Sequence, residues 1–197
     1  VVDDGSLDKT SLKLNDLRKN YKKLNIEIHT KNLGYGAANQ TGIAYANKKN
    51  YDYVLFMDAD LTQNINYLFD FIYLMNKGTD LIKATRYADG GGADGVNLFR
   101  KIVSKVGNLL AKKLMNLPIT DYTNGFRAIK TDLVANISFE EYGFAYLIEE
   151  VNKVSKKAKT FGEVPYILSV RKDNHSKSKF TYSLEVYFSY LKWVFRK

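Results

Sequence analysis

The chain contains 197 residues, 45% of them hydrophobic and 14% aromatic, which is enough for one substantial folded domain and excludes a disordered chain. It has no cysteine, which excludes disulfide frameworks and thiolate metal sites and makes a reducing compartment the expectation. It has only two histidines, so a histidine-rich metal site is hard to build. The formal charge of +9 predicts a polyanionic partner (nucleic acid, an anionic membrane or a phosphorylated small molecule), or else only a lysine-rich solvated surface.

Strand-like and helix-like segments alternate from the N-terminus onward. Residues 1–4 have the pattern of the end of a buried strand. Residues 53–60 form a continuous apolar run ending in acids, which is typical of a central parallel strand buried on both faces. Between these strands we expect a helix over 11–24, a strand over 26–30 and an Ala-rich helix over 36–50.

The alternation continues to the C-terminus, and no run approaches the roughly 20 apolar residues of a transmembrane helix. The expected elements are a helix over 65–78 stopped by Gly78, a strand over 80–87, a helix over 96–117, a strand over 125–130, a helix over 144–158 and a strand over 161–171. The 96–117 helix is amphipathic, with an apolar stripe through Leu98, Ile102, Val106, Leu109 and Leu117.

This order of elements predicts an α/β fold in one domain, with a mostly parallel sheet and helices on both faces. Ligands of such sheets bind beyond the carboxyl ends of the strands. The acids that end the first and third strands, Asp3, Asp4, Asp58 and Asp60, are therefore expected at the ligand edge. The glycine-rich loop over 86–95 is expected to be flexible and close to the same site.

Asp58 and Asp60 are the strongest local signal in the chain. Residues two apart in an extended segment point the same way, so these carboxylates should converge and repel each other unless a cation lies between them. Hard oxygen ligands favour Mg²⁺ or Mn²⁺, and Gln63 or Thr62 could add a neutral oxygen. The alternative is that the acids only cap the helix that begins near Asn64.

A glycine-rich segment at 31–42 opens the second helix. Gly34 and Gly36 allow close backbone approach, and a helix N-terminus can hold an anion, so both are predicted to lie against a bound nucleotide. The segment lacks the G-x-G-x-x-G pattern and the P-loop lysine, and a tight strand-to-helix turn explains the glycines equally well.

Basic and polar residues gather near the expected ligand edge. Arg100, Ser104 and Asn108 recur every four residues and so share one face of the 96–117 helix. Arginines at such an edge suit a phosphate oxyanion, although ordinary surface ion pairing explains any one of them alone. The other members of the set are Arg86, Arg127, Arg171 and Lys177.

The chain resembles the family-two glycosyltransferases of the GT-A fold. The matching strings are "VVDDGSLDKT", "NLGYGAANQTG", "VLFMDADL", "DYTNGFRA", "YGFAYLIEE", "EVPYILSVR" and "HSKSK", in the order of the family and over nearly the whole chain. The later strings resemble the dolichol-phosphate mannose synthase and polyprenyl-phosphate glycosyltransferase branch.

The chain departs from the pattern of this branch in two places. Thr62 takes the place of the branch's third metal ligand, with Gln63 next to it, and the family's opening strand is not in this chain, so we expect an N-terminally truncated copy.

The resemblance implies a role for each matching residue. Asp3 or Asp4 would contact the nucleotide base. Asp58 and Asp60, with Gln63, would hold the Mg²⁺ or Mn²⁺ ion and the donor diphosphate. The acceptor phosphate and the transferring sugar would contact Arg86, Arg100, Ser104 and Arg171. Lys177 would lie in a loop that closes over the donor.

The activity implied is a metal-dependent, inverting transfer of a hexose, mannose or glucose, from a GDP- or UDP-sugar to a polyprenyl or dolichyl phosphate. A phosphomonoester is largely dianionic at neutral pH, so no general base is required. The aromatic and basic segment 181–197 is predicted to be a membrane-interface helix or, equally, a helix packed on the sheet. Together these features predict a cytoplasmic protein at the cytoplasmic face of a membrane.

Three other functions fit the sequence less well. Transfer to a saccharide or wall-polymer hydroxyl would need a carboxylate base near the acceptor, and the arginine-rich acceptor side argues against it. A sugar nucleotidyltransferase should show a basic, glycine-rich phosphate loop on its first strand. A nucleic-acid-binding module would explain the charge but not the four acids at the strand ends, so no nucleic-acid partner is expected.

Overall fold

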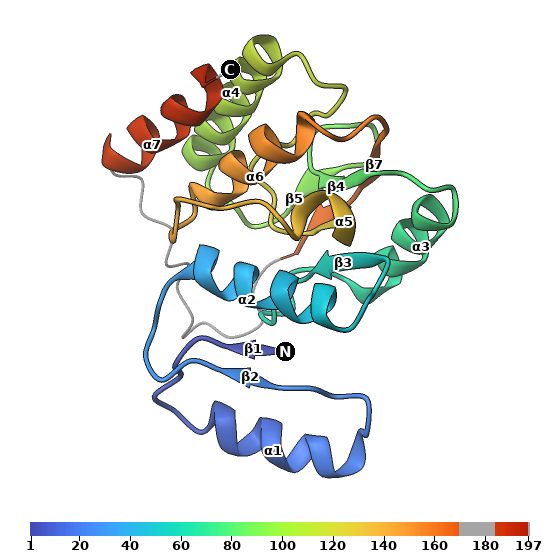
Figure 1. Cartoon of the computed structure of the whole chain (residues 1–197). Helices are drawn as coiled ribbons and strands as arrows, with labels where there is room; N and C mark the ends of the chain where they lie inside the picture. The colour runs from blue at the N-terminus through green and yellow to red at the C-terminus, as the bar shows by residue number, and fades with distance from the viewer. Residues whose placement is uncertain (170–183, 197) are drawn as a thin grey trace.

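A four-stranded sheet with helices on both faces forms the centre of the computed structural model, which describes residues 1–169 and 184–196 (Figure 1). The helices are α1 (Thr10–Asn20), α2 (Tyr35–Lys48), α3 (Leu68–Asn76), α4 (Leu98–Met115), α5 (Thr131–Val134), α6 (Tyr146–Ser155) and α7 (Leu184–Phe195), and a 3-10 turn over Ile65–Tyr67 precedes α3. The strands are β1 (Val2–Asp3), β2 (Glu27–Ile28), β3 (Tyr53–Phe56), β4 (Leu81–Thr85), β5 (Gly92–Ala93), β6 (Arg127–Lys130), β7 (Phe161–Pro165) and β8 (Ile167–Leu168).

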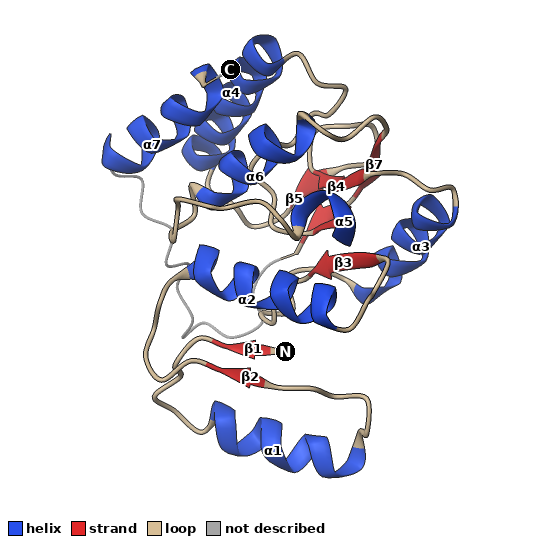
Figure 2. Cartoon of the chain, viewed as in Figure 1, coloured by secondary structure: helices blue, strands red, loops and turns tan. Residues whose placement is uncertain are grey.

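The main sheet has the order β3-β6-β4-β7 and is mixed. Figure 2 draws the strands in red between the helices in blue. β6 is antiparallel to both β3 and β4, whereas β4 and β7 are parallel. Two further parallel pairs, β1 with β2 and β5 with β8, form small sheets of their own. The α/β class is confirmed. The described strands do not form a mostly parallel main sheet. That prediction failed because hydrophobic periodicity identifies a strand but not its direction.

The prediction that 53–60 is a central parallel strand is wrong for the described pairing. β3 lies at the end of the strand order, and it pairs with β6 alone among the described strands. Its continuous apolar character has another cause. Val54 packs into the core under α2, and Leu55 packs against the core under α3, so both faces of β3 are covered by helices.

Alternate residues of the central strands point into two separate cores. Leu81 and Ile129 lie in the core shared with α2, α5 and α6, whereas Ile82 and Ala128 lie in the core shared with α3 and β7. Helices therefore cover both faces of the sheet, as predicted. α2 also packs against β1 as well as β3, which ties the N-terminal pair of strands to the rest of the molecule.

A third core lies between α4, α6 and α7. Trp193 of α7 is fully buried there against Ile148 and Val151 of α6, and its indole Nε1 donates a hydrogen bond to Glu141 at 2.8 Å. The face of the C-terminal helix that carries Trp193 is thus packed inside the molecule, although it packs on α4 and α6 and not on the sheet as the alternative predicted. The opposite side of α7 exposes Phe188 and Phe195.

Two helices bury less than their apolar spacing predicted. None of the residues of α1 is buried. In α4 the buried residues are Asn108 and Ala111, and the stripe that includes Leu98, Ile102 and Val106 is exposed. Periodicity identifies the two faces of a helix, but it does not identify which face meets the core.

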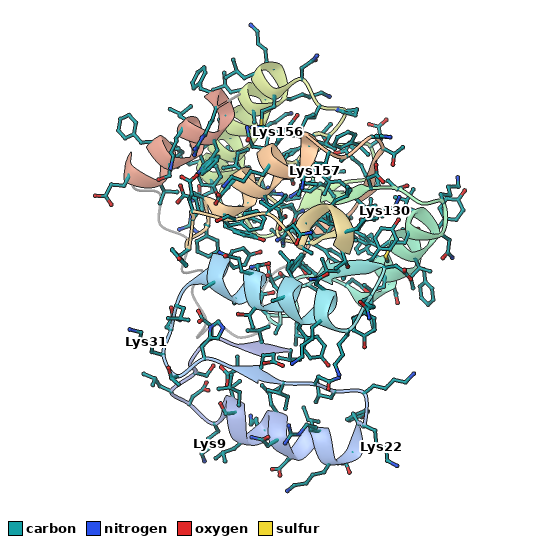
Figure 3. The ribbon with its side chains drawn as sticks, in the orientation of Figure 1. Lys9, Lys22, Lys31, Lys130, Lys156 and Lys157 are labelled. Atoms are coloured by element: carbon teal, nitrogen blue, oxygen red, sulfur yellow. The ribbon has the colours of Figure 1, made fainter. Side chains whose placement is uncertain are left out.

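The positive charge is distributed over the surface of the molecule. Figure 3 shows Lys9 and Lys22 at the two ends of α1, Lys31 in the loop before α2, and Lys156 with Lys157 after α6, in widely separated places. For these lysines the arrangement favours the interpretation as a solvated surface over a single binding patch.

Candidate active site

A cavity of about 1400 Å³ opens beside the main sheet, between the loop after β3, the end of β4, and helices α4, α6 and α7. It is larger than the roughly 300–1,000 Å³ of ordinary small-ligand sites, so it has room for more than one substrate. Six of the predicted site residues line it, although they come from three separate parts of the chain: Asp58, Asp60, Gln63, Arg86, Arg100 and Ser104.

The two acids of the predicted metal site lie in the loop that follows Phe56, the last residue of β3. Asp58 donates its backbone N–H to Gln63 Oε1 at 2.9 Å, and Gln63 Nε2 donates to Asp58 Oδ2 at 3.0 Å. Asp60 accepts from the backbone N–H and the hydroxyl of Thr62, at 3.1 and 2.7 Å. Residues 59 and 60 form a turn instead of an extended segment, yet both carboxylates reach the same cavity.

Two carboxylates suit a divalent cation that is shared with a substrate. No group of three acidic or histidine side chains able to hold a metal ion occurs among the described residues. Mg²⁺ is usually bound by one or two carboxylates together with waters and substrate phosphates, so the pair Asp58 and Asp60 fits such an ion. The amide oxygen of Gln63 accepts from the Asp58 backbone, so Gln63 orients Asp58 here, and its role as a metal ligand stays a prediction.

The wall beside Asp58 is formed by Gly125 and Tyr35. A Cβ atom added at Gly125 would lie 2.7 Å from the Tyr35 hydroxyl and 3.5 Å from Asp58 Oδ2, so only glycine fits there without displacement. Tyr35 stacks on Phe144 with ring centroids 5.1 Å apart, which limits how far it can move. Burial raises the pKa of Tyr35 to about 12, so its phenol is protonated at neutral pH.

Arg86 is held at the cavity wall by a buried carboxylate. Its Nε and Nη2 donate to Asp121 Oδ2 and Oδ1 at 2.7 and 3.0 Å, and Nη2 also donates to the Thr123 hydroxyl at 3.2 Å. Burial opposes the charge of Asp121, but the Arg86 guanidinium outweighs it and the pKa of Asp121 lies below its usual range. A guanidinium fixed by a bidentate pair is oriented before any ligand arrives.

The polar face of α4 joins the helix to the segment 121–125. Asn108 accepts from the backbone N–H of Tyr122 at 2.6 Å, and its amide donates to the Thr123 hydroxyl at 3.2 Å. Ser104, one turn earlier, accepts from the Tyr87 hydroxyl at 2.7 Å. The predicted common face of Arg100, Ser104 and Asn108 is therefore the one that meets the cavity and the sheet end.

A buried lysine supports the same segment from beneath. Lys83 of β4 is fully buried, and its Nζ donates to the backbone oxygen of Asn124 at 2.6 Å and of Tyr122 at 3.4 Å. Burial lowers the pKa of Lys83 to about 7. Neither Lys83 nor the residues Tyr35, Asp121 and Gly125 was identified from the sequence. The string "DYTNGFRA" was the available signal for Asp121 and Gly125.

Asp3 and Asp4 bind different parts of the N-terminal region. Asp3 accepts from the Ser6 backbone N–H at 3.0 Å and from the Ser11 hydroxyl, and the Ser11 bond is the main reason that the pKa of Asp3 is lowered. Asp4 accepts from the Gly34 backbone N–H at 2.9 Å. Its other oxygen accepts from the Leu33 N–H at 2.8 Å and lies 2.7 Å from His29 Nδ1.

Gly34 and Gly36 are required by close packing against the segment before α6. Gly34 has φ of +100°, and an added Cβ atom would lie 2.5 Å from the Tyr142 carbonyl oxygen. A Cβ atom at Gly36 would lie 2.2 Å from the Glu141 oxygen. Neither glycine lines the cavity formed by the described residues, and neither do Asp3 and Asp4. Their contact with a nucleotide stays a prediction.

Arg171 and Lys177 fall outside the residues that the structure describes. Within residues 1–169 and 184–196, none of the helices is long and apolar enough to span a membrane.

Comparison with known proteins adds a family and a fold to this geometry. The model of the family described as glycosyl transferase family 2 matches residues 1–138. The chain is 30% identical to the dolichol-phosphate mannosyltransferase of Pyrococcus furiosus, with 100% of this chain and 53% of that protein aligned, so it spans about half the length of that relative. It is 26% identical to the polyprenol monophosphomannose synthase of Mycolicibacterium smegmatis, with 100% and 76% aligned.

Solved structures share the fold of the chain at lower identity. Glucosyl-3-phosphoglycerate synthase from Mycobacterium tuberculosis, in complex with Mn²⁺, UDP-glucose and phosphoglyceric acid, matches with a TM-score of 0.63 and 17% identity, over 98% of this chain and 67% of that one. The same enzyme in complex with Mg²⁺ and UDP matches with a TM-score of 0.61 at 16% identity. These likenesses show that the fold is GT-A.

Proposed function

We propose that this chain, which belongs to glycosyl transferase family 2 and has the GT-A fold, transfers a hexose from a nucleotide sugar to a polyprenyl phosphate. The transfer would proceed with inversion at the anomeric carbon. The names of the two aligned relatives support a lipid-phosphate acceptor and make mannose the first sugar to test, with glucose second.

One observation carries this proposal: a single cavity joins an acidic end, a basic middle and an apolar groove. Asp58 and Asp60 lie at the acidic end, and Arg86 with Arg100 lies in the middle. Beyond them the cavity continues between α4 and α7. The groove is lined by Ile102, Val106 and Leu110 of α4, and by Val186, Tyr187, Tyr190, Leu191 and Val194 of α7. The order of these three surfaces matches, in turn, the diphosphate of the donor, the phosphate of the acceptor and the hydrocarbon chain of the acceptor.

The middle of the cavity would bind the acceptor phosphate. A phosphomonoester with a second pKa near 6 is already a dianionic nucleophile at neutral pH, so no general base is needed. Arg86, held by Asp121, and Arg100 would place its oxygen in line with the anomeric carbon, and Ser104 would add a hydroxyl contact. Fixed charges in a preorganised site and correct positioning would account for most of the rate.

The acidic end would bind the donor. Asp58 and Asp60 would hold Mg²⁺ or Mn²⁺ together with the donor diphosphate, and a bound divalent ion stabilises the negative charge that develops on a diphosphate leaving group. Gln63 keeps the Asp58 carboxylate oriented for this purpose. Thr62 does the same for Asp60.

The nucleotide end involves the N-terminal strands. Asp3 or Asp4 is proposed to contact the GDP or UDP base. Asp3 accepts hydrogen bonds from Ser6 and Ser11, and Asp4 accepts from Leu33 and Gly34, so these bonds favour neither acid. Arg171 and Lys177 are proposed from the family resemblance for the acceptor phosphate and the donor. A lipid-linked acceptor also implies a membrane surface as partner, and we propose the cytoplasmic face because nucleotide sugars are the donors.

The test is a transfer assay with purified protein, radiolabelled GDP- and UDP-hexoses, dolichyl phosphate, and Mg²⁺ or Mn²⁺. We expect a charged glycolipid to form, with mannose from GDP-mannose as the first candidate. Asp60→Ala should remove the activity, whereas Asp16→Ala, which changes an exposed acid on α1 paired with Lys19, should retain it. Sugar transfer to a saccharide hydroxyl, or full activity in Asp60→Ala, would overturn the proposal.

A further inference from the structure

The segment 121–125 carries parts of both ends of the candidate site. Asp121 fixes Arg86 in the basic middle of the cavity through a bidentate ion pair. Gly125 forms the wall beside Asp58 at the acidic end, where an added Cβ atom would lie 3.5 Å from the Asp58 carboxylate. A shift of this segment would therefore displace the acceptor side and the donor side of the site together.

Two buried cations hold the backbone of this segment. Lys83 of β4 and Arg127 of β6 are fully buried, and they are register partners in adjacent antiparallel strands. The Nζ atom of Lys83 donates to the backbone oxygens of Asn124 at 2.6 Å and Tyr122 at 3.4 Å. Nη1 of Arg127 donates to the backbone oxygen of Gly125 at 2.7 Å. The position of the segment therefore depends on two positive charges that lie beneath it.

Lys83 differs from the neighbouring arginines because it lacks a carboxylate partner. Arg86 pairs with Asp121, and Arg127 pairs with Glu150. Within the part of the chain that the structure describes, no ion pair joins Lys83 to a carboxylate, and its hydrogen bonds go to carbonyl oxygens alone. A buried cation without a charged partner is costly, so Lys83 loses its proton more readily than a paired cation would.

The charged groups around Lys83 come from each element packed against it: Arg86, Asp121, Arg127, Glu150 and Glu163. Burial disfavours the charge of Lys83 most strongly, and the two arginines add to this effect, whereas Asp121 and Glu150 favour the charge. Glu163 is the register partner of Lys83 on β7, but its carboxylate accepts from the backbone N–H and the hydroxyl of Thr120, at 2.6 and 2.7 Å. Burial lowers the pKa of Lys83 from its ordinary value of 10.5 to about 7.

We propose that Lys83 is a positioning residue for sugar transfer: its ammonium group fixes the segment 121–125, and transfer slows as that group loses its proton. An ammonium group donates to both carbonyl oxygens through charge-assisted hydrogen bonds, whereas a neutral amine makes weaker bonds and has a lone pair that repels a carbonyl oxygen. Lys83 does not line the cavity, so it acts through the segment and not on a substrate. The inference rests on the proposed function for the reaction that is slowed.

The pH dependence of kcat in the wild type and in Lys83→Met tests this role. Methionine is unbranched and uncharged, and the ratio of the two kcat values cancels the ionisation of every other group in the assay. We expect the ratio to be roughly tenfold or more at about pH 6, because small displacements in a site are costly, and to narrow toward one above about pH 8. A ratio that does not change with pH overturns the inference. Lys19→Met, on the exposed surface of α1, is the control and should match the wild type throughout.

Urea unfolding separates positioning from a merely structural role. The folded pKa of Lys83 lies below its ordinary value, so the unfolded chain binds more protons between about pH 7 and 10.5, and stability rises with pH across that range. The wild type should therefore gain stability relative to Lys83→Met while it loses its advantage in kcat. If the advantage in kcat instead rises together with the stability, Lys83 is only structural and the inference is overturned.

Two measurements on the wild type need neither a substrate nor a variant. In protein with ¹³C-labelled lysine, one lysine Cε signal should titrate near pH 7, and amide hydrogen exchange within 121–125, corrected for the intrinsic rate, should accelerate above that pH. If every lysine signal titrates above about pH 9, as exposed lysines do, the inference is overturned. A protein that shows both effects but transfers no sugar supports the hold of Lys83 on the segment and overturns only the proposed function.

Discussion

The side-chain amide of Gln63 bridges the backbone N–H and the carboxylate of Asp58, at 2.9 and 3.0 Å, from within a buried position. Asp58 is the first of the two cavity acids, so a neutral residue that is itself hidden from solvent decides where that carboxylate points. This bridge therefore helps to orient the Asp58 carboxylate within the cavity.

Gln63→Leu, which keeps the size of the side chain but removes both hydrogen bonds, should lower Mn²⁺ affinity and kcat/KM by roughly 10–100-fold, as for other residues that orient metal ligands. Titration of Mn²⁺ by electron paramagnetic resonance measures the affinity directly. Gln40→Leu on α2 is the control, because its buried amide nitrogen has no hydrogen-bond partner among the described residues. Unchanged Mn²⁺ affinity in Gln63→Leu would show that the bridge does not orient the site.

Gly125→Ala should lower kcat/KM by roughly 100-fold, because displacements of about 1 Å in a site can cost that much. The added Cβ atom would lie 2.7 Å from the Tyr35 hydroxyl and so displace the wall beside Asp58. Steady-state kinetics and thermal unfolding measure the two effects separately. Gly143→Ala, where an added Cβ atom meets nothing within 4 Å, is the matched control.

Tyr35→Phe provides a rescue test for the contact between the added Cβ atom at position 125 and the Tyr35 hydroxyl. It removes the oxygen that the new methyl group would meet, so Gly125→Ala combined with Tyr35→Phe should recover part of the lost kcat/KM. A double variant as inactive as Gly125→Ala alone would place the cause elsewhere.

Asp121→Asn should destabilise the protein by roughly 3–5 kcal/mol, since it leaves the largely buried Arg86 guanidinium without its charged partner. Urea unfolding gives the free energy change. Combining it with Arg86→Met should restore much of the stability but none of the transfer activity, because the uncompensated charge is gone and so is the phosphate contact. An additive double-variant cycle would mean that the pair is not coupled.

Acid should destabilise the protein through Asp80, which joins β4 to the start of β7. Burial opposes its charge, but the Lys130 ammonium and the backbone N–H groups of Lys159 and Thr160 lower the pKa of Asp80 to about 2. A carboxyl with a lower pKa in the folded state adds stability above its unfolded pKa of about 4, and loses it as pH falls toward 2.

Unfolding free energies measured across that range should therefore fall more steeply in the wild type than in Asp80→Asn, which is expected to be less stable at pH 7. Asp16→Asn on the exposed surface of α1 is the control and should follow the wild type. Parallel curves for the wild type and Asp80→Asn would show that Asp80 does not carry this dependence.

Local patterns predicted the order of helices and strands well. The 80–87 strand and the helix over 65–78 appear close to their expected positions as β4 and α3, and Gly78 follows the end of that helix with φ of +77°. These features depend on neighbours in the chain, such as apolar spacing and helix-stop residues, and such signals are readable without the fold. The run 161–171 was expected as one strand, but its described part divides into β7 and β8 at Tyr166.

Six residues of the candidate site were also identified in advance, because polar residues that follow apolar strands mark the ligand edge of an α/β sheet. Their partners were not. Asp121 meets Arg86 across 35 positions of sequence, and Lys83 supports Asn124 from a strand that looked entirely structural. Such pairs depend on which segments the fold brings together.

The sequence by itself determined the α/β class, the family and the acids and arginines that surround the cavity, since each follows from residue type and local spacing. Only the tertiary structure decided that β6 runs antiparallel, that Gly34 and Gly36 are required by the backbone of Glu141 and Tyr142, and that α4 turns its apolar face outward. The physical reason is the same in all three cases. Strand direction, close backbone approach and the buried side of a helix depend on what packs against a segment, and that information lies elsewhere in the chain.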